Sequence, residues 1–198
     1  MYPENFNEKK EYIAKIACEV FASKGYKESS LQDVSIKGNI SKAGIYHYFK
    51  TKEDILAYVL LRSAECSTEA LMQCLKAAGE KQLNPKETVE AISATYANYL
   101  LENPEVSQVV LRDRHQLRGD NKKALLEKEK GIFQIFRNQL RKLPNINHKI
   151  NINLISFQII SMVHWMGYWF DGKGSLPKNE AIDQTVRIIF DGILERKK

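Results

Sequence analysis

Apolar residues near the start of the chain recur at the three- or four-residue spacing of an amphipathic helix. Ile13, Ala17 and Phe21 follow this spacing. The pattern predicts a helix from about Asn7 to Lys24. Gly25 comes directly afterwards, and glycine most readily takes the left-handed conformation found at helix ends. We therefore expect the first helix to stop there.

Two short helices follow, separated by a tight turn. Ser30 and Asp33 have the S-x-x-D pattern of a capping box, which predicts a helix from Leu31 to Lys37. The pair Gly38-Asn39 tolerates positive φ, and Ser41 can cap the next helix. A helix, a turn and a helix form a helix-turn-helix motif, whose second helix has the size to enter the major groove of DNA.

The third helix is bounded by another capping box, formed by Thr51 and Asp54. It should therefore end near Phe49 or Lys50, and a long fourth helix should begin there. Later breaks occur at Asn-Pro pairs and at glycine-rich or proline-containing segments, while no segment alternates with a period of two. We expect about nine helices and no sheet.

An all-α protein with two functional parts is the resulting prediction. Residues 1–52 are expected to form a three-helix helix-turn-helix domain that binds DNA. Residues 53–198 are expected to form a bundle of about six helices. The composition, 43% hydrophobic and 27% charged, is typical of a folded globular protein. The most apolar stretch, 150–170, is interrupted by polar side chains, so we expect no contact with a membrane.

The predicted third helix has two different faces. Ile45 and Phe49 are four residues apart and should face the core. The other face is basic, because the segment from Lys37 to Lys52 holds four lysines and no acidic residue. The candidates for base contacts are Lys42, Ala43 and Gly44, and those for phosphate contacts are Tyr46, His47, Tyr48, Thr51 and Lys52.

Each of these residues has a simpler explanation when taken alone. Tyr46 and Tyr48 can be half-buried core aromatics, and the lysines can form a solvated helix face. Two capping boxes, a Gly-Asn turn and an acid-free basic helix nevertheless occur together, and the combination favours DNA binding. A net charge of +6 is compatible with a polyanionic partner.

The cysteines and the N-terminal segment bear on the compartment. Cys18, Cys66 and Cys74 form no C-x-x-C motif, and an odd, scattered number is typical of a reducing environment. The first twenty residues are charged and periodic, without the continuous apolar core of a signal peptide. We expect a cytoplasmic protein.

The segment "IAKIACEVFASKGYKESSLQDVSIKGNISKAGIYHYFKTKEDIL" resembles the N-terminal DNA-binding domain of the tetracycline-repressor (TetR) family of bacterial transcription regulators over its whole length. The resemblance implies an all-helical homodimer. It also implies that residues 53–198 form an effector-binding and dimerisation domain. A small molecule bound there would separate or reorient the two DNA-binding domains and release the operator. The positions that match DNA-facing positions of the family are Ser30, Gln32, Ser41, Lys42, Ala43, Gly44, Tyr46, His47, Tyr48, Thr51 and Lys52.

Two departures from the family pattern lie near the turn. Ser35 stands where alanine is usual against the core, and "KGN" replaces the common "xAG". Asn39 can adopt the left-handed conformation that the family glycine supplies. We expect both departures to reduce the stability of the domain without changing its fold.

The last two predicted helices suggest how the chain dimerises. Residues 148–171 are apolar on nearly every side, and a helix of this kind needs cover all round. The final helix, Asn179 to Glu195, has one apolar face formed by Ile182, Val186, Ile189 and Ile193. We expect both helices to pair with their copies across a two-fold axis as a four-helix bundle. Such a dimer would present two recognition helices to a near-palindromic operator.

An effector pocket is expected among the remaining helices. Arg112 and His115 belong to a basic cluster that can hold an anionic head group, although a solvated, salt-bridged helix face explains it equally well. Aromatic residues at helical spacing are also more often core than ligand contacts. The candidate lining residues are Tyr96, Tyr99, Leu100, Arg112, His115, Phe133, Phe136, His164, Trp165 and Trp169.

A second, shorter resemblance concerns the segment "HWMGYWFDGKGSLPKNEAID". It is similar to a C-terminal domain of regulators of fatty-acid and sterol breakdown that respond to acyl-CoA thioesters. This resemblance favours a long apolar acid or its CoA ester as the effector, with other hydrophobic molecules as alternatives. We expect the regulator to be a repressor that the effector releases from DNA. A DNA-binding protein without a small-molecule effector is the alternative.

An all-helical enzyme is the other class of function compatible with a helical bundle. Di-iron bundles need E-x-x-H pairs, and no histidine in the chain has a glutamate three positions before it. The chain also has no zinc-type Cys/His pair, no G-x-S-x-G motif and no phosphate loop. We therefore predict no enzyme activity, no catalytic residue, no cofactor and no metal site.

Overall fold

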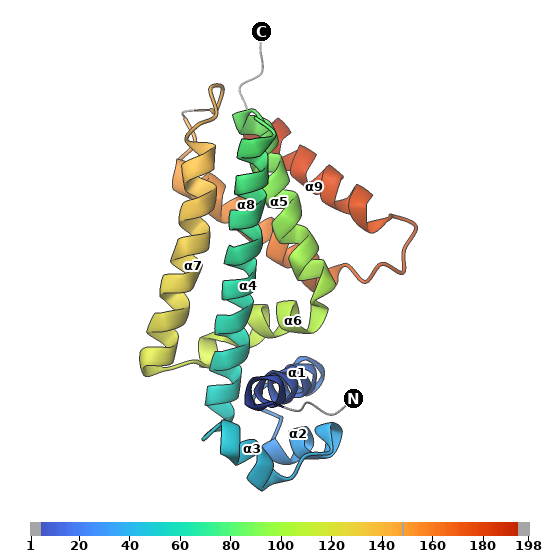
Figure 1. The fold of residues 1–198 in the computed structure, drawn as a ribbon. Coiled ribbons are helices and arrows are strands. Elements are labelled where there is room, and N and C mark those ends of the chain that lie inside the picture. The colour runs from blue at the N-terminus through green and yellow to red at the C-terminus, as the bar shows by residue number, and fades with distance from the viewer. Residues whose placement is uncertain (1–4, 148, 194–198) are drawn as a thin grey trace. The chain divides into compact units, whose positions relative to one another are not determined.

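The computed structural model describes residues 5–147 and 149–193, and this part of the chain is mostly helical (Figure 1). No β-strand occurs within these ranges, which confirms the predicted all-α class. The predicted end of the last helix, at Glu195, lies outside the described residues. The helices are α1 (Phe6–Lys24), α2 (Leu31–Gly38), α3 (Lys42–Tyr48), α4 (Lys52–Glu80), α5 (Pro85–Glu102), α6 (Pro104–Asp113), the 3-10 helix η1 (Arg114–Gln116), α7 (Gly119–Leu140), α8 (Ile152–Trp169) and α9 (Lys178–Ile193).

The chain divides into two compact units. Unit 1 comprises Met1–Ala64 and Glu105–Lys128, and unit 2 comprises Glu65–Pro104 and Glu129–Lys198. Helices α4 and α7 therefore each begin in unit 1 and end in unit 2. The functional division between residues 1–52 and 53–198 stays a prediction. None of the described helices is long and apolar enough to cross a membrane.

The end of α1 differs from the expected left-handed stop. Gly25 has a positive φ of 91°, as predicted, but its ψ of 144° lies outside the left-handed helical region. The Gly25 amide still donates to the Phe21 carbonyl at 2.8 Å, and its carbonyl accepts from the Ser29 amide at 3.1 Å. The chain therefore leaves α1 in an extended direction and closes a short loop onto Ser29.

Local capping explains where α2 and α4 begin. The Asp33 amide donates to Ser30 Oγ at 3.2 Å, and Asp33 Oδ2 accepts from the Ser30 amide at 2.8 Å. Thr51 and Asp54 form the same reciprocal pair at 2.9 and 3.1 Å. An ion pair with Lys24, together with the bonds to Ser30, holds the pKa of Asp33 well below its usual range. Both predicted capping boxes are confirmed.

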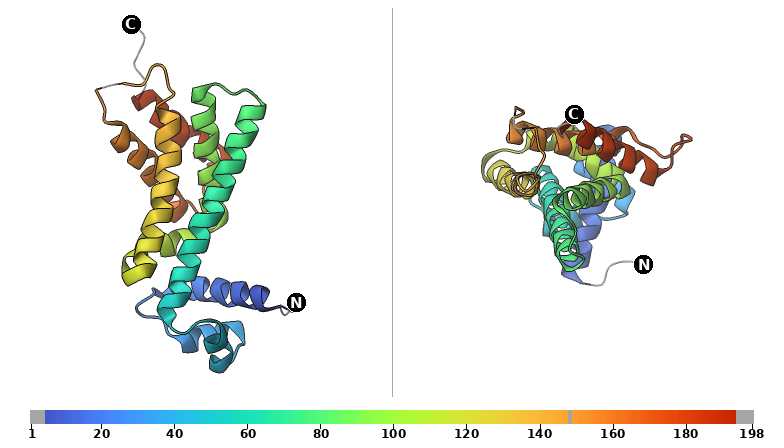
Figure 2. Two further views of the ribbon diagram at one scale, coloured as in Figure 1. Left: turned by 60° about the vertical axis from the view of Figure 1, so that its left-hand side comes forward. Right: turned by 90° about the horizontal axis from the view of Figure 1, so that it is seen from above.

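The core of unit 1 holds the three small helices together. Helices α2 and α3 lie together on one side of α1 (Figures 1 and 2). Gly38, at the end of α2, allows a close approach, because a Cβ atom there would lie 3.0 Å from Ile40 Cδ1 and 3.3 Å from Ile16 Cγ2. The buried side chains of this core include Ile13, Phe21, Val34, Ile45, Phe49, Ile55, Leu56 and Leu60.

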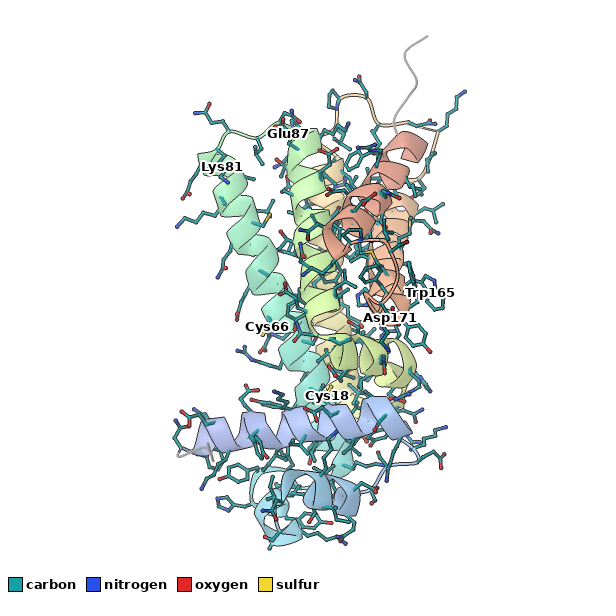
Figure 3. All side chains as sticks on the ribbon, turned by 90° about the vertical axis from the view of Figure 1, so that its right-hand side faces the viewer. Cys18, Cys66, Lys81, Glu87, Trp165 and Asp171 are labelled. Carbon is teal, nitrogen blue, oxygen red and sulfur yellow. The ribbon has the colours of Figure 1, made fainter. Side chains whose placement is uncertain are left out.

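Three helices of unit 2, α5, α8 and α9, pack against one another. The buried face of α8 carries Ile155, Ile159, Val163 and Met166. Successive residues of an α-helix are about 100° apart around its axis. Other apolar residues of α8 therefore lie on the opposite side of the helix and remain exposed. We define the α8 stripe as Leu154, Phe157, Trp165 and Trp169. Figure 3 shows Trp165 at the outer side of this unit.

The apolar face of α9 corrects one prediction. Ile182, Val186 and Ile189 were expected to pair with a second copy of the chain, but all three are buried within the chain itself. Helix α9 instead exposes Ile188, whose side chain is 64% accessible. The side chain of Ile193 lies outside the described residues.

Candidate nucleic-acid interface

The two faces of α3 are separated as the sequence predicted. Ile45 and the capping residue Phe49 are buried, at 0% and 3% exposure. Ser41 caps the helix by accepting a hydrogen bond from the Gly44 amide at 3.0 Å. Tyr46, on the other face, is 54% exposed. A short helix is thus anchored by apolar residues and presents polar ones to solvent.

Most of the predicted DNA-facing residues lie at the surface of unit 1. They come from three elements: the start of α2, the whole of α3 and the start of α4. Their contact with DNA stays a prediction. The exposed residues are Ser30, Gln32, Ser41, Lys42, Ala43, Tyr46, His47 and Thr51, and the partly buried ones are Gly44, Tyr48 and Lys52.

The turn between α2 and α3 is held by residues that depart from the family pattern. Asn39 adopts the left-handed conformation, with φ 49° and ψ 46°, as predicted. Ser35 Oγ donates to the Ile40 carbonyl at 2.6 Å, a bond that alanine cannot make. We expected Ser35 to reduce stability, but it ties the two sides of the turn together.

Gly44 has a packing role that the sequence did not reveal. A Cβ atom at this position would lie 3.1 Å from Ile40 Cγ2 and 3.2 Å from Ser41 Oγ. Both distances are tighter than ordinary contacts, so a larger residue would require these two side chains to shift by a few tenths of an ångström. This requirement exists whether or not DNA approaches the backbone there.

An aromatic cluster connects the start of α1 to the end of α3. The Phe6 ring lies 4.6 Å from the Tyr48 ring and 5.9 Å from the His47 ring. The His47 and Tyr48 rings are themselves 5.0 Å apart, at 87°. Phe6 therefore supports two predicted phosphate contacts. This contact could not be predicted from the sequence, because Phe6 precedes His47 by about forty residues.

A groove of about 290 Å³ runs beside this cluster. Its walls come from α1, the turn and α3. Lys9 and Tyr12 contribute polar groups from α1, and neither was among the predicted DNA contacts. The other lining residues are Ile13, Ile40, Ser41, Gly44, His47 and Tyr48.

Replacing Lys9 with glutamine tests whether DNA phosphates reach this groove. We expect Lys9→Gln to lower the slope of log affinity against log salt concentration by about 0.9, the value for one lost phosphate contact. Lys15→Gln is the matched control, because Lys15 is exposed on the same helix but does not line the groove. Fluorescence anisotropy at four salt concentrations measures both slopes. Equal slopes for the two variants would exclude Lys9 as a contact.

Lys52, a predicted phosphate contact, makes hydrogen bonds within the protein that were not predicted from the sequence. Its ammonium donates to the carbonyls of Tyr26 and Ser29 at 2.6 and 2.7 Å, and lies 4.4 Å from the centre of the Tyr26 ring. Burial lowers the pKa of Lys52 from its ordinary value. The ammonium is thus directed at a loop of the same unit.

Arg112, a predicted effector contact, is also engaged within unit 1. Its guanidinium donates to the Ala22 carbonyl at 3.1 Å and to the Phe21 carbonyl, both in the last turn of α1. It also pairs with the buried carboxylate of Asp113 at 3.1 Å. Arg112 therefore ties α6 to α1 by satisfying carbonyls at a helix end. His115 is exposed and contacts Gln116 at 2.6 Å.

Unit 2 brings together several of the other effector candidates. The Tyr96 hydroxyl lies 2.5 Å from His164 Nε2, and the Tyr96 ring lies 5.9 Å from the Phe136 ring. Burial raises the pKa of Tyr96 above its ordinary value, so its hydroxyl is neutral at physiological pH. Phe133 contacts Phe157 at 4.7 Å.

The remaining candidates are distributed differently. Leu100 is buried and Tyr99 is half-buried on α5, the helix that carries Tyr96. Trp165 and Trp169 are 59% and 54% exposed on the α8 stripe, opposite the buried face of that helix. The structure does not bring these two tryptophans together with the Tyr96 cluster. Within the described residues, no group of three metal-ligating side chains occurs.

Two family models match this chain. The model for bacterial regulatory proteins of the tetR family matches residues 13–59. The model for the tetracyclin repressor-like C-terminal domain matches residues 82–193, which is more than half of the chain. The chain belongs to the TetR family. It is therefore a DNA-binding transcriptional regulator and not an enzyme.

The chain is also similar to individual proteins, one of which, PfmR, is a TetR family transcriptional regulator. The transcriptional activator FasR of Mycolicibacterium smegmatis is 18% identical over 181 residues, covering 89% of this chain and 79% of FasR. The crystal structure of the TetR regulator PfmR from Thermus thermophilus has a TM-score of 0.79 at 26% identity, covering 93% of this chain and 99% of PfmR. The structure of AibR in complex with isovaleryl coenzyme A and operator DNA has a TM-score of 0.82 at 18% identity, covering 92% and 98%.

Proposed function

We propose that this TetR-family regulator is a repressor that leaves a near-palindromic operator when it binds a hydrophobic or amphipathic effector. The observation that carries the DNA-binding half of the proposal is the outward face of α3, which combines an exposed Lys42 with an exposed Tyr46. Residues 1–52 would bind DNA, and residues 53–198 would bind the effector and a second copy. The protein would act in the cytoplasm, where its operator lies.

We assign the contacts by their reach and chemistry. Lys42 and Ala43 lie in the first turn of α3 and would contact base edges, the lysine at acceptors and the alanine at a thymine methyl. The hydroxyls of Tyr46, Tyr48 and Thr51 would bind phosphates and fix the register of the helix in the groove. Ser30 and Gln32, at the start of α2, and His47 would extend the phosphate contacts to either side.

Dimerisation would use the α8 stripe together with Ile188 of α9. The members of the stripe are 52% to 59% exposed. Large apolar side chains gathered on one helix face are typical of a protein-protein contact. A two-fold axis beside α8 would pair these side chains with their copies. The two DNA-binding domains of the dimer would then face the two half-sites of the operator.

An acyl-CoA thioester is the effector class that we favour. The AibR structure contains isovaleryl coenzyme A, and the C-terminal segment of this chain resembles acyl-CoA-responsive regulators. The Tyr96–His164 pair supplies polar atoms among aromatic side chains in unit 2, a combination that suits the polar end of a largely apolar ligand.

Arg112 suggests how α6 would influence the DNA-binding domain. Because its guanidinium bonds the last-turn carbonyls of α1, a displacement of α6 would pull on the helix that supports α2 and α3. The amide of Arg118 adds a second tie within unit 1, since it donates to Glu53 Oε1 of α4 at 3.0 Å. We propose that the effector acts on DNA affinity through these ties.

Selection of bound duplexes from a random DNA pool tests the function most broadly. We expect a near-palindromic sequence to emerge. Addition of an acyl-CoA should then lower the affinity for that duplex by between about 5-fold and 150-fold, the usual range of allosteric coupling.

The arms of the release assay separate the possible effectors. Palmitoyl-CoA, isovaleryl-CoA, palmitate and free CoA should be compared at equal concentrations. Release by palmitate alone would assign a fatty acid instead of a thioester. If none of the four changes the affinity, a DNA-binding protein without such an effector is the better description.

A further inference from the structure

The ammonium of Lys52 occupies a ring of main-chain oxygens in the loop between α1 and α2. It donates to the Tyr26 carbonyl at 2.6 Å and the Ser29 carbonyl at 2.7 Å, with the Lys27 carbonyl at 3.5 Å. The face of the Tyr26 ring covers it at 4.4 Å. These contacts surround the positive charge with dipoles from the protein.

A lysine ammonium has three donors, and two of them make short bonds to the loop while the Lys27 carbonyl lies at 3.5 Å. Ser29 is buried, so its carbonyl would lose a charged partner in a poorly hydrated place if Lys52 turned outward. A phosphate contact would therefore require Lys52 to give up bonds that it already makes. Lys42 faces no such requirement, because its side chain is exposed.

The loop that Lys52 binds determines where α2 begins. Ser29 precedes Ser30, the capping residue of α2, and Lys52 is the first residue of α4. The Ser29 hydroxyl also donates to the Tyr26 carbonyl at 2.8 Å, and the Tyr26 ring packs on Phe21 at 5.3 Å. Lys52 thus joins the start of α2 to the start of α4, the two elements that flank α3.

We propose that Lys52 is a positioning residue that holds the starts of α2 and α4 in register for DNA, and that it is not a phosphate ligand. This inference rests on the proposed DNA binding. It revises the role that the family resemblance implied for this position. Ser30 and Thr51 are two of the proposed phosphate contacts. The distance between them across the DNA groove then depends on Lys52.

The salt dependence of operator binding separates the two roles. Lys52→Met keeps the apolar stem and removes the ammonium. We expect it to lower operator affinity by about tenfold at every salt concentration, because displaced contacts are lost while the number of neutralised phosphates is unchanged. Lys50→Met is the matched control, since it removes the same charge from an exposed lysine two residues earlier. A slope lowered by about 0.9 relative to Lys50→Met would overturn the proposal.

Hydrogen exchange of the free protein gives a readout that needs no DNA. We expect the amides of residues 26–30 to exchange at least about tenfold faster in Lys52→Met than in the parent, with no change in Lys50→Met. Unchanged exchange in Lys52→Met would overturn the positioning role. If the parent bound no duplex at all, the proposed function would fail while the exchange result still reported on Lys52.

Discussion

A chain carrying Leu154→Glu and Trp165→Glu is expected to be monomeric at micromolar concentration and to bind its operator at least about a hundredfold more weakly than the parent. Both side chains belong to the α8 stripe and are more than half exposed in a single chain. Glutamates at these exposed positions leave the core of the single chain intact. At a two-fold contact, however, their charges would be buried without an oppositely charged partner, which is costly. A dimer with two linked DNA-binding domains binds its operator about 10² to 10⁴ times more tightly than a single domain does, and the monomer loses this gain.

Sedimentation velocity measures the mass of the particle, and anisotropy measures operator binding. The matched control is Gln134→Glu with Asn138→Glu, which adds the same two charges at exposed positions of α7. The control should remain dimeric and bind like the parent. If the stripe variant sediments as an intact dimer with an unchanged thermal midpoint, the α8 stripe is not the contact.

Ile189→Asp, a natural choice from the sequence, is a poor probe of the dimer. Ile189 is buried within its own chain, so a charge there would unfold unit 2 before it could report on association. The expected result for Ile189→Asp is loss of the cooperative thermal transition, detected by circular dichroism.

The second large effect is expected at the reading face. Lys42→Ala should lower affinity for the selected operator by about 5-fold to 150-fold, since a specific lysine contact with a base carries about 1–3 kcal/mol of discrimination. Its affinity for an unrelated duplex should fall by less than about fivefold, because only one charge is lost. The ratio of the affinity for the operator to the affinity for the unrelated duplex should therefore decrease.

Tyr46→Phe provides the contrasting variant on the same helix face. It removes only a hydroxyl that is proposed to bind a phosphate, so both duplexes should lose affinity by the same small factor, about threefold to tenfold. Competition anisotropy with the two duplexes gives both ratios. Parent-like discrimination by Lys42→Ala would show that Lys42 does not read bases.

Local signals account for what the sequence predicted well. The capping boxes at Ser30 and Thr51 and the left-handed Asn39 are determined by residues within three positions of one another. The same is true of the inward placement of Ile45, which follows from helical spacing alone. The helix-turn-helix and its outward face could therefore be predicted without any tertiary information.

Contacts between distant segments account for what the sequence did not predict. The oxygens that bind Lys52 lie more than twenty residues before it, and the carbonyls that bind Arg112 lie ninety residues before it. Each cation was assigned to a ligand because its partner could not be identified. The same reason explains α8 and α9: their apolar faces were evident, but the packing with α5 decides which face remains exposed.

The most direct test of the central claim places a photoreactive side chain on α3. Tyr46→p-benzoylphenylalanine, irradiated with the selected operator, should cross-link to DNA within each half-site, while Gln134→p-benzoylphenylalanine on α7 should not. A cross-link from position 134 and none from position 46 would contradict the claim that the outward face of α3 reads the DNA.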